Sequence, residues 1–327
     1  MAEPALKNYF GYDASTFMAD RSDYRAKEWN NLVYDELANN RPVYYTGQSL
    51  GGGHAFLIDG YDEDGYFHVN WGWGGACDSY FLLSILDPDS NDGIGASSST
   101  DGYSFYQGAL IVAQPYTGQP NSNAIMTIYT MTVENSVIAK QDDVFPISAV
   151  GEIYNMTNET INFELGLGIY TKDNELLYAE SNGNEELESG WGWTSLELGA
   201  NVPALPDGDY IITTISRNMG TTKWHQSLGS TKCYAIATIA GDQLTLKMPI
   251  TDLSGSMEIV GDQKVGNQLT VKTTIDNNGT PFNDIFWLFV NGHEVGAQHF
   301  DIAGGDTDIL EMSFTLDSED ESYVSLG

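Results

Sequence analysis

Basic residues are scarce in this chain of 327 residues, which has 13 lysines and arginines against 46 aspartates and glutamates and a formal net charge of −33 at pH 7. The first 119 residues already hold 16 acidic and 5 basic side chains, so no acidic tail accounts for the imbalance. Such a uniform negative field repels nucleic acids and anionic membrane surfaces. We therefore expect no nucleic acid as a partner.

Cysteine is rare as well, since only Cys77 and Cys233 occur. Two cysteines make no disulfide framework, and we expect two unpaired thiols. The histidines outside the amino-terminal region have no Cys, Asp or Glu at ligand spacing, so we expect no metal site and no cofactor; they are His225, His293 and His299.

Long apolar runs are missing too. No stretch of 18 apolar residues occurs, and residues 1–15 lack the basic and apolar regions of a signal peptide. We expect no membrane insertion, and we interpret both ends of the chain as cuts in a longer protein. The aromatic content of 12% is far above that of a disordered chain, and the length suggests two or three folded domains.

The hydrophobic period changes once along the amino-terminal region. Residues 22–39 have the spacing of an amphipathic helix, and the apolar residues that follow alternate with a period of two. The segments "HAFLIDGY" and "GYFHVNW" are predicted strands, with Asp64 and Gly65 as the turn between them. His54 would open one strand and Asn70 would close its neighbour, so the hairpin would bring the two residues together.

The rest of the chain is predicted to be β throughout. Residues 87–103 are rich in Gly, Ser and Asp, and we expect a mobile loop there. A linker at 119–124 precedes a β-sandwich of about seven strands at 125–249, where Tyr210 stands in the place of the corner tyrosine of immunoglobulin-like folds. A second immunoglobulin-like sandwich at 250–327 is expected to be incomplete. The predicted fold class is mostly β with a small α+β part.

The chemistry of this hairpin is predicted from its histidine. A histidine that works as a general base needs a nucleophile on one ring nitrogen and an orienting group on the other. The amide oxygen of Asn70 can accept the imidazole N–H of His54 without adding a charge, as in the cysteine-peptidase variant of the catalytic triad. Trp71 or Trp73 would then cover this contact and exclude water.

Several stretches carry a resemblance to a known family. Residues from about 5 to 116 contain, in order, "ALKNYFGYDAS", "RPVYYTG", "GGHAFLIDGY", "FHVNWGWGG", "YFLLSILDP" and "YQGALIV". This region resembles the C-terminal half of the peptidase domain of the streptopain family, secreted bacterial cysteine peptidases with a papain-like fold. The resemblance implies that residues 1–118 form the β-barrel-like half of a papain-like domain that hydrolyses protein or peptide substrates. It also implies a bacterial protein that is secreted or held at the cell surface.

The resemblance also implies roles for single residues. His54 is the catalytic histidine, Asn70 and Trp71 support it with either of them able to orient the ring, and the 87–103 loop borders the substrate cleft. A further set is implied to support the site or line the cleft, namely Gly53, Trp73, Gly74 and Gly75. His68, two residues before Asn70, is expected to point to the same face of its strand and to give packing or hydrogen-bonding support.

The sequence departs from the family at the nucleophile. In the family, the cysteine lies upstream of the histidine at the start of a helix, with the glutamine of the oxyanion hole, whereas no cysteine precedes His54 here. Cys77 lies in a glycine-rich turn without a helix N-terminus to lower its pKa, so it is a poor nucleophile candidate. We expect a fragment that is inactive alone and whose partner is the missing N-terminal half. The alternative is a non-catalytic adhesion or carbohydrate-binding protein with a relic peptidase half.

Overall fold

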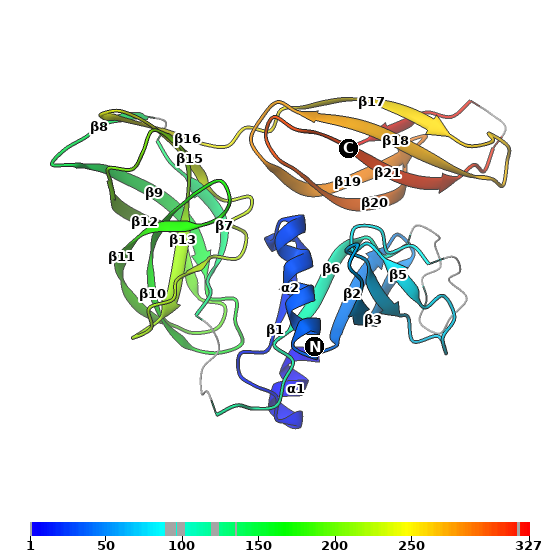
Figure 1. The fold of residues 1–327 in the computed structure, drawn as a ribbon, viewed down its shortest axis with the longest axis horizontal. Helices are drawn as coiled ribbons and strands as arrows, with labels where there is room; N and C mark the ends of the chain where they lie inside the picture. The colour runs from blue at the N-terminus through cyan, green and yellow to red at the C-terminus, as the bar shows by residue number, and fades with distance from the viewer. Residues whose placement is uncertain (1, 89–95, 97–101, 119–123, 135, 319–320) are drawn as a thin grey trace. The chain divides into compact units, whose positions relative to one another are not determined.

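The structure is a computed structural model, and it describes residues 2–88, 96, 102–118, 124–134, 136–318 and 321–327. The chain divides into two compact units, one formed by residues 1–119 with 251–327 and the other by residues 120–250 (Figure 1). As predicted, the protein is mostly β, with a small α+β part at the amino terminus. The predicted division into four consecutive segments stays a prediction.

The amino-terminal part combines two helices with one antiparallel sheet (Figure 1). Its elements are α1 (Ala2–Phe10), β1 (Phe17–Asp20), a 3-10 turn (Arg21–Asp23), α2 (Ala26–Ala38), β2 (Val43–Ser49), β3 (Gly52–Tyr61), β4 (Phe67–Asn70), β5 (Ser79–Phe81) and β6 (Phe105–Ile111). The strand order is β1-β6-β2-β3-β4-β5. The strand that carries His54, β3, therefore has a hydrogen-bonded partner on both sides.

The helices differ in how well the sequence predicts them. The prediction of a helix at 22–39 is confirmed by α2, although α2 starts at Ala26 because the Asp20 carboxylate accepts the N–H of Ser22 at 2.9 Å and begins the 3-10 turn instead. Trp29 and Val33, one turn apart on α2, are fully buried. The first helix, α1, was not predicted, and it buries no residue that could reveal a periodic face. Among the described residues, no helix has the length and hydropathy of a membrane-spanning segment.

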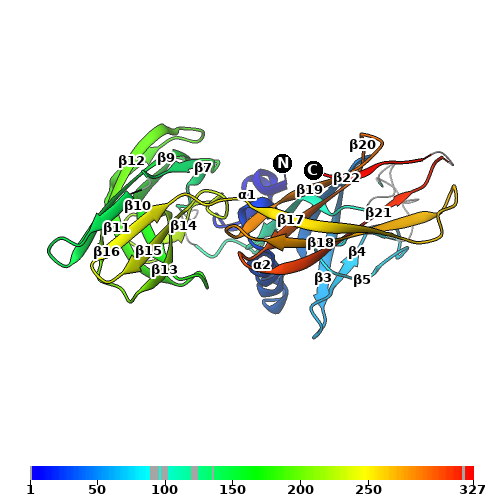
Figure 2. The same ribbon diagram turned by 90° about the horizontal axis from the view of Figure 1, so that it is seen from above.

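Residues 120–250 form two antiparallel sheets around one core (Figures 1 and 2). Their strands are β7 (Thr127–Thr132), β8 (Ser136–Ala139), β9 (Val144–Tyr154), β10 (Ile161–Tyr170), β11 (Leu176–Leu187), β12 (Gly192–Pro203), β13 (Gly208–Asn218), β14 (His225–Gln226), β15 (Ala235–Ala240) and β16 (Gln243–Lys247). One sheet has the order β12-β9-β7 and the other β11-β10-β13-β15-β16-β8, with β14 beside β13. The hydroxyl of Tyr210 donates to the carbonyl of Pro206 at 2.7 Å, which is the contact expected of a corner tyrosine.

Residues 251–327 form a smaller two-sheet body around a core of their own (Figure 2). Its strands are β17 (Leu253–Val260), β18 (Gln268–Asn277), β19 (Phe282–Val290), β20 (His293–Ile302), β21 (Thr307–Thr315) and β22 (Val324–Leu326). The two sheets have the orders β17-β18-β21 and β20-β19-β22.

The two β bodies repeat one topology. The set β7-β9-β12 with β11-β10-β13 in the first body recurs as β17-β18-β21 with β20-β19-β22 in the second. A buried asparagine lies at the end of the central strand in both, Asn155 directly after β9 and Asn277 as the last residue of β18. Each donates from Nδ2 to the carbonyl at the end of the second hairpin strand, at 2.9 Å to Leu187 and 3.2 Å to Ile302. This internal repeat was not predicted from the sequence.

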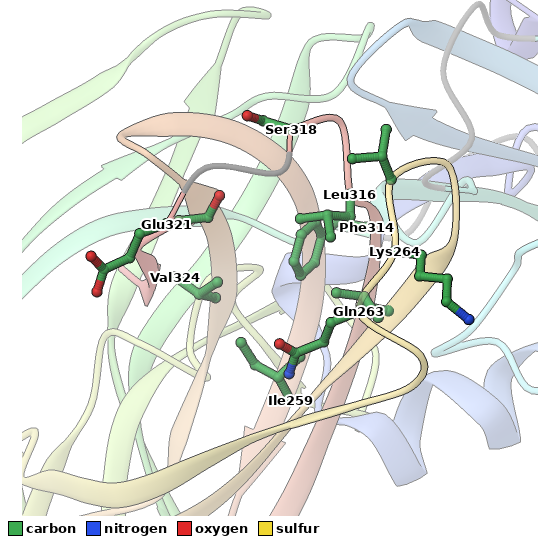
Figure 3. A pocket seen from close by; sticks show the side chains of 11 residues that line it. Ile259, Gln263, Lys264, Phe314, Leu316, Ser318, Glu321 and Val324 are labelled. Atoms are coloured by element: carbon green, nitrogen blue, oxygen red, sulfur yellow. The ribbon is translucent and has the colours of Figure 1, made fainter.

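A cavity of about 760 Å³ opens at one end of the smaller body (Figure 3). Its apolar lining includes Phe314 of β21 and Val324 of β22. By register, Val324 corresponds to Ile212 of the first body, which is buried and pairs with Ala235 of β15. Among the described residues of 251–327, no strand takes the place of β15, and the cavity lies beside this position.

Candidate active site

The hairpin formed by β3 and β4 places His54 beside Trp71. Side chains alternate along β3, so His54 lies on the same face as the buried Phe56 and Ile58. The hairpin pairs Leu57 with Asn70, and the chain continues to Trp71. His54 Nε2 then lies 2.9 Å from the main-chain carbonyl oxygen of Trp71. The predicted hairpin with its short turn is confirmed.

This contact determines which nitrogen of His54 carries the proton. A carbonyl oxygen can only accept a hydrogen bond, so Nε2 must be the N–H donor. In the neutral imidazole, Nδ1 then holds the lone pair. The ring is therefore arranged to take a proton at Nδ1 while the backbone holds it at Nε2.

Asn70 does not make the contact predicted for it. It pairs with Leu57, which is 43% exposed and lies on the opposite face of β3 from His54. Its Oδ1 accepts the N–H of Gly72 at 3.0 Å. The prediction that the Asn70 amide oxygen holds the imidazole is therefore corrected, because strand alternation turns this side chain away and the Trp71 carbonyl takes the position.

Aromatic rings surround the imidazole. The Trp73 ring stacks on it with centroids 5.1 Å apart and an interplanar angle of 24°, and the Tyr103 ring lies at 5.5 Å. Trp71 and Phe56 lie at 6.4 and 5.9 Å. Trp71 and Tyr103 are fully buried, so these rings shield one side of the part-buried His54 contact. The tryptophan was predicted to cover a contact between His54 and Asn70, whereas the Trp73 ring stacks on an imidazole that binds the Trp71 carbonyl.

The glycine-rich segment after Trp71 is a tight loop. Its backbone has positive φ at Gly72, Gly74 and Gly75, with values of 78°, 68° and 92°, and these angles favour glycine. The loop is closed by Asp78, whose Oδ1 accepts the N–H of Trp71 at 3.0 Å. The glycines therefore allow the chain to return to β5 while Trp71 stays fixed. Gly53 lies in β3, where a Cβ would meet the Gln48 side chain.

Cys77 lies at the end of this loop with φ of 62°, directly before Asp78. It is half-buried and packs against the core of the amino-terminal part. No helix begins there, so no helix N-terminus favours its thiolate. Neither Cys77 nor Cys233 forms a disulfide.

Three residues of the site were missed by the sequence analysis. Gly47 pairs with His54 across β2 and β3, and a Cβ on it would lie 2.3 Å from the Tyr103 carbonyl oxygen. Because Gly47 has no Cβ, Tyr103 can approach the imidazole. A glycine inside the strand "VYYTGQS" is the signal that could have indicated a close approach. No sequence pattern indicated a role for Asp78 or Tyr103.

His68 takes no part in this arrangement. It lies on the outer face of β4, as does Asn70, and its Nδ1 is 2.5 Å from Oδ1 of Asp59. Among the residues that the structure describes, no cluster of three or more His, Cys, Asp or Glu could hold a metal ion. Most of the predicted 87–103 loop lies outside the described residues.

The amino-terminal region matches known cysteine peptidases. Residues 1–81 match the Peptidase C10 family. Streptopain of Streptococcus pyogenes is 42% identical over 111 residues, which cover 34% of this chain and 27% of streptopain. The thiol protease/hemagglutinin PrtT of Porphyromonas gingivalis is 44% identical over 113 residues, which cover 35% of this chain and 13% of PrtT.

Among solved structures, active wild-type interpain A, a cysteine protease of Prevotella intermedia, is 31% identical. The match covers 34% of this chain and 44% of interpain A, with a TM-score of 0.30. The chain thus spans about a quarter of the length of the streptopains that it matches. The resemblance of its amino-terminal region to the streptopain family of cysteine peptidases, Peptidase C10, is confirmed.

Proposed function

We propose that residues 1–118 are the histidine-bearing half of a cysteine endopeptidase site that acts on protein or peptide substrates. The observation that carries this proposal is the bond from His54 Nε2 to the Trp71 carbonyl, which leaves Nδ1 to exchange a proton with a thiol. The stacked Trp73 ring supports the same role, because it packs against the imidazole and restricts the orientation of the ring. The sequence match to streptopain supports the class of reaction.

The mechanism begins with a cysteine thiolate paired with the His54 imidazolium. The thiolate attacks the carbonyl carbon of the scissile peptide, and a tetrahedral oxyanion forms. As the C–N bond breaks, Nδ1 of His54 gives its proton to the leaving amine. Water then attacks the thioester, His54 takes the water proton, and the carboxylic acid product and the thiolate are released. Throughout, the Trp71 carbonyl holds the ring.

We propose that the thiolate comes from a complementary half of the peptidase domain. Cys77 is a poor candidate because it follows a glycine-rich loop with no helix N-terminus beside it, and Cys233 belongs to the other compact unit. The oxyanion-hole glutamine would come from the complementary half as well. The two-sheet modules are then accessory parts of a secreted or surface-held bacterial enzyme.

The 327-residue chain alone is therefore expected to hydrolyse no protein substrate. Without the nucleophile, nearly all of the rate is lost, since nucleophile and base act as a unit. Casein hydrolysis is measured under reducing conditions for this chain and for the Cys77→Ala variant. Thiol-dependent hydrolysis that disappears in Cys77→Ala would show that His54 has an internal nucleophile and would overturn the assignment to a complementary half.

A further inference from the structure

Two polar side chains bind the backbone on either side of Trp71, and neither touches His54. We propose that Asn70 and Asp78 are positioning residues that hold the imidazole through the backbone, an inference that rests on the function proposed above. The Asn70 side chain binds the N–H of Gly72, and the Asp78 carboxylate binds the N–H of Trp71.

The peptide unit between Trp71 and Gly72 links Asn70 to His54. Its N–H donates to Asn70 Oδ1 at 3.0 Å, and its C=O accepts from His54 Nε2 at 2.9 Å. The peptide is planar and trans, so its N–H and C=O point in opposite directions. One rigid group therefore connects the outer face of β4 with the imidazole on the inner face.

The two hydrogen bonds strengthen each other. An acceptor at the N–H draws the proton toward itself and raises the electron density on the carbonyl oxygen of the same peptide, so the carbonyl becomes a better acceptor. Asn70 thus stabilises the His54 orientation in two ways, by fixing the plane of the peptide and by polarising its carbonyl. The side chain performs this role although strand alternation turns it away from the ring.

Asp78 fixes the preceding peptide unit, between Asn70 and Trp71. The loop between its two ends contains four residues with positive φ, Gly72, Gly74, Gly75 and Cys77, so it has no regular hydrogen-bond ladder to hold its shape. The bond from the Trp71 N–H to the Asp78 carboxylate closes this loop at 3.0 Å. Hydrogen bonds to an ionised acceptor are stronger than those between neutral groups. Both peptides that flank the Trp71 side chain are therefore held.

The test observes the His54 ring directly in the full chain. With 15N-labelled histidine, NMR gives the rate at which the Nε2 proton exchanges with solvent. We expect Asn70→Ala to raise this rate about three- to tenfold, the range of one net hydrogen bond. Asn70→Asp, which keeps an acceptor oxygen for Gly72, is expected to restore the rate to within about twofold of the original.

His68→Ala is the matched control, because His68 lies on the same face of β4 without a bond to either peptide. Equal exchange in Asn70→Ala and His68→Ala, or no recovery in Asn70→Asp, would overturn the inference. If Asn70→Ala does not fold, Asp78→Ala compared with Asp78→Asn gives the same contrast at the other peptide, and equal rates there would overturn it too. The readout needs no peptidase activity, so a failure of the proposed function is observed separately.

Discussion

At the scale of single residues, one position in a strand decides which atom holds the histidine. Asn70 and Trp71 are adjacent, and the alternation of β4 turns the Asn70 side chain outward while the Trp71 carbonyl comes within 2.9 Å of Nε2. The motif predicted the hairpin and the residues, but the choice between a side chain and a main-chain carbonyl depends on the register Leu57 with Asn70. That register depends on tertiary pairing and could not be predicted from the motif.

Gly47→Ala tests the packing behind the imidazole. Its new methyl group would lie 2.3 Å from the Tyr103 carbonyl oxygen, a backbone atom that cannot swing aside. We expect the free energy of unfolding to fall by about 1–3 kcal/mol, as for other overpacked sites, measured by urea denaturation. Gly53→Ala is the control, because its new Cβ would meet only the flexible Gln48 side chain. Equal stability of the two variants would contradict the close approach of Tyr103.

At the scale of elements, periodic segments could be predicted and tertiary contacts could not. The period of two gave β2, β3 and β4, and the apolar spacing gave α2. The α1 helix has no buried face, and the Gly47 and Tyr103 contact joins positions 56 residues apart through packing alone. The local sequence pattern therefore predicted His54 and its hairpin. The aromatic rings around the imidazole could be identified only from the folded sheet.

The connection between α1 and β1 depends on an aspartate. Asp13 is 1% exposed and accepts the N–H groups of Ser15 at 3.0 Å and Thr117 at 2.9 Å. Burial alone would raise the pKa of Asp13, but hydrogen bonds from the Thr117 and Ser15 hydroxyl and N–H groups outweigh it and lower the pKa below its usual value of 3.8. The carboxylate therefore stabilises the folded state above about pH 4, and this contribution is lost as the pH falls.

We accordingly expect the free energy of unfolding to decrease below pH 4 more steeply in the original protein than in Asp13→Asn, by up to about 1.4 kcal/mol per pH unit, the slope of one proton. Chemical denaturation at pH 4, 3 and 2 gives this slope. Asp35→Asn, a change at an exposed helix position, should keep the original slope. Parallel slopes for Asp13→Asn and the original protein would contradict the lowered pKa.

At the scale of the whole molecule, two β bodies with one topology follow the amino-terminal part. The repeat is visible in strand order and in the asparagines Asn155 and Asn277, while few of the surrounding residues are alike. Val324 lines the cavity in Figure 3 and corresponds by register to Ile212, which pairs with β15 in the first body. The alternation of residues and the turn residues between the segments predicted the β class of this region, but the shared topology could be recognised only from the pairing of strands.

The hydrogen bonds of the buried Asn155 predict a large effect of one substitution. Asn155 is 0% exposed, and its side chain donates to the Glu159 and Leu187 carbonyls at 2.8 and 2.9 Å and accepts the Thr157 N–H at 3.0 Å. Asn155→Ala should lower the free energy of unfolding of residues 120–250 by about 2–4 kcal/mol, because it leaves buried groups unsatisfied. Hydrogen exchange followed by mass spectrometry assigns the loss to this unit. As a control, the substitution Asn201→Ala at an exposed position should change the free energy of unfolding by less than about 0.5 kcal/mol. Similar losses in both variants would contradict the structural role of Asn155.

The most direct measurement is the peptidase activity of a chimera that contains the complementary half of the domain. The chimera joins, before Met1, the part of Streptococcus pyogenes streptopain that precedes the matched region. Casein hydrolysis is followed under reducing conditions, and a thiol-directed inhibitor labels the reactive cysteine. We predict thiol-dependent hydrolysis that falls at least about 100-fold in His54→Ala and stays within about twofold in His68→Ala. Two results would contradict this prediction. One is hydrolysis that persists in His54→Ala, and the other is a folded chimera that hydrolyses nothing although its streptopain cysteine is labelled.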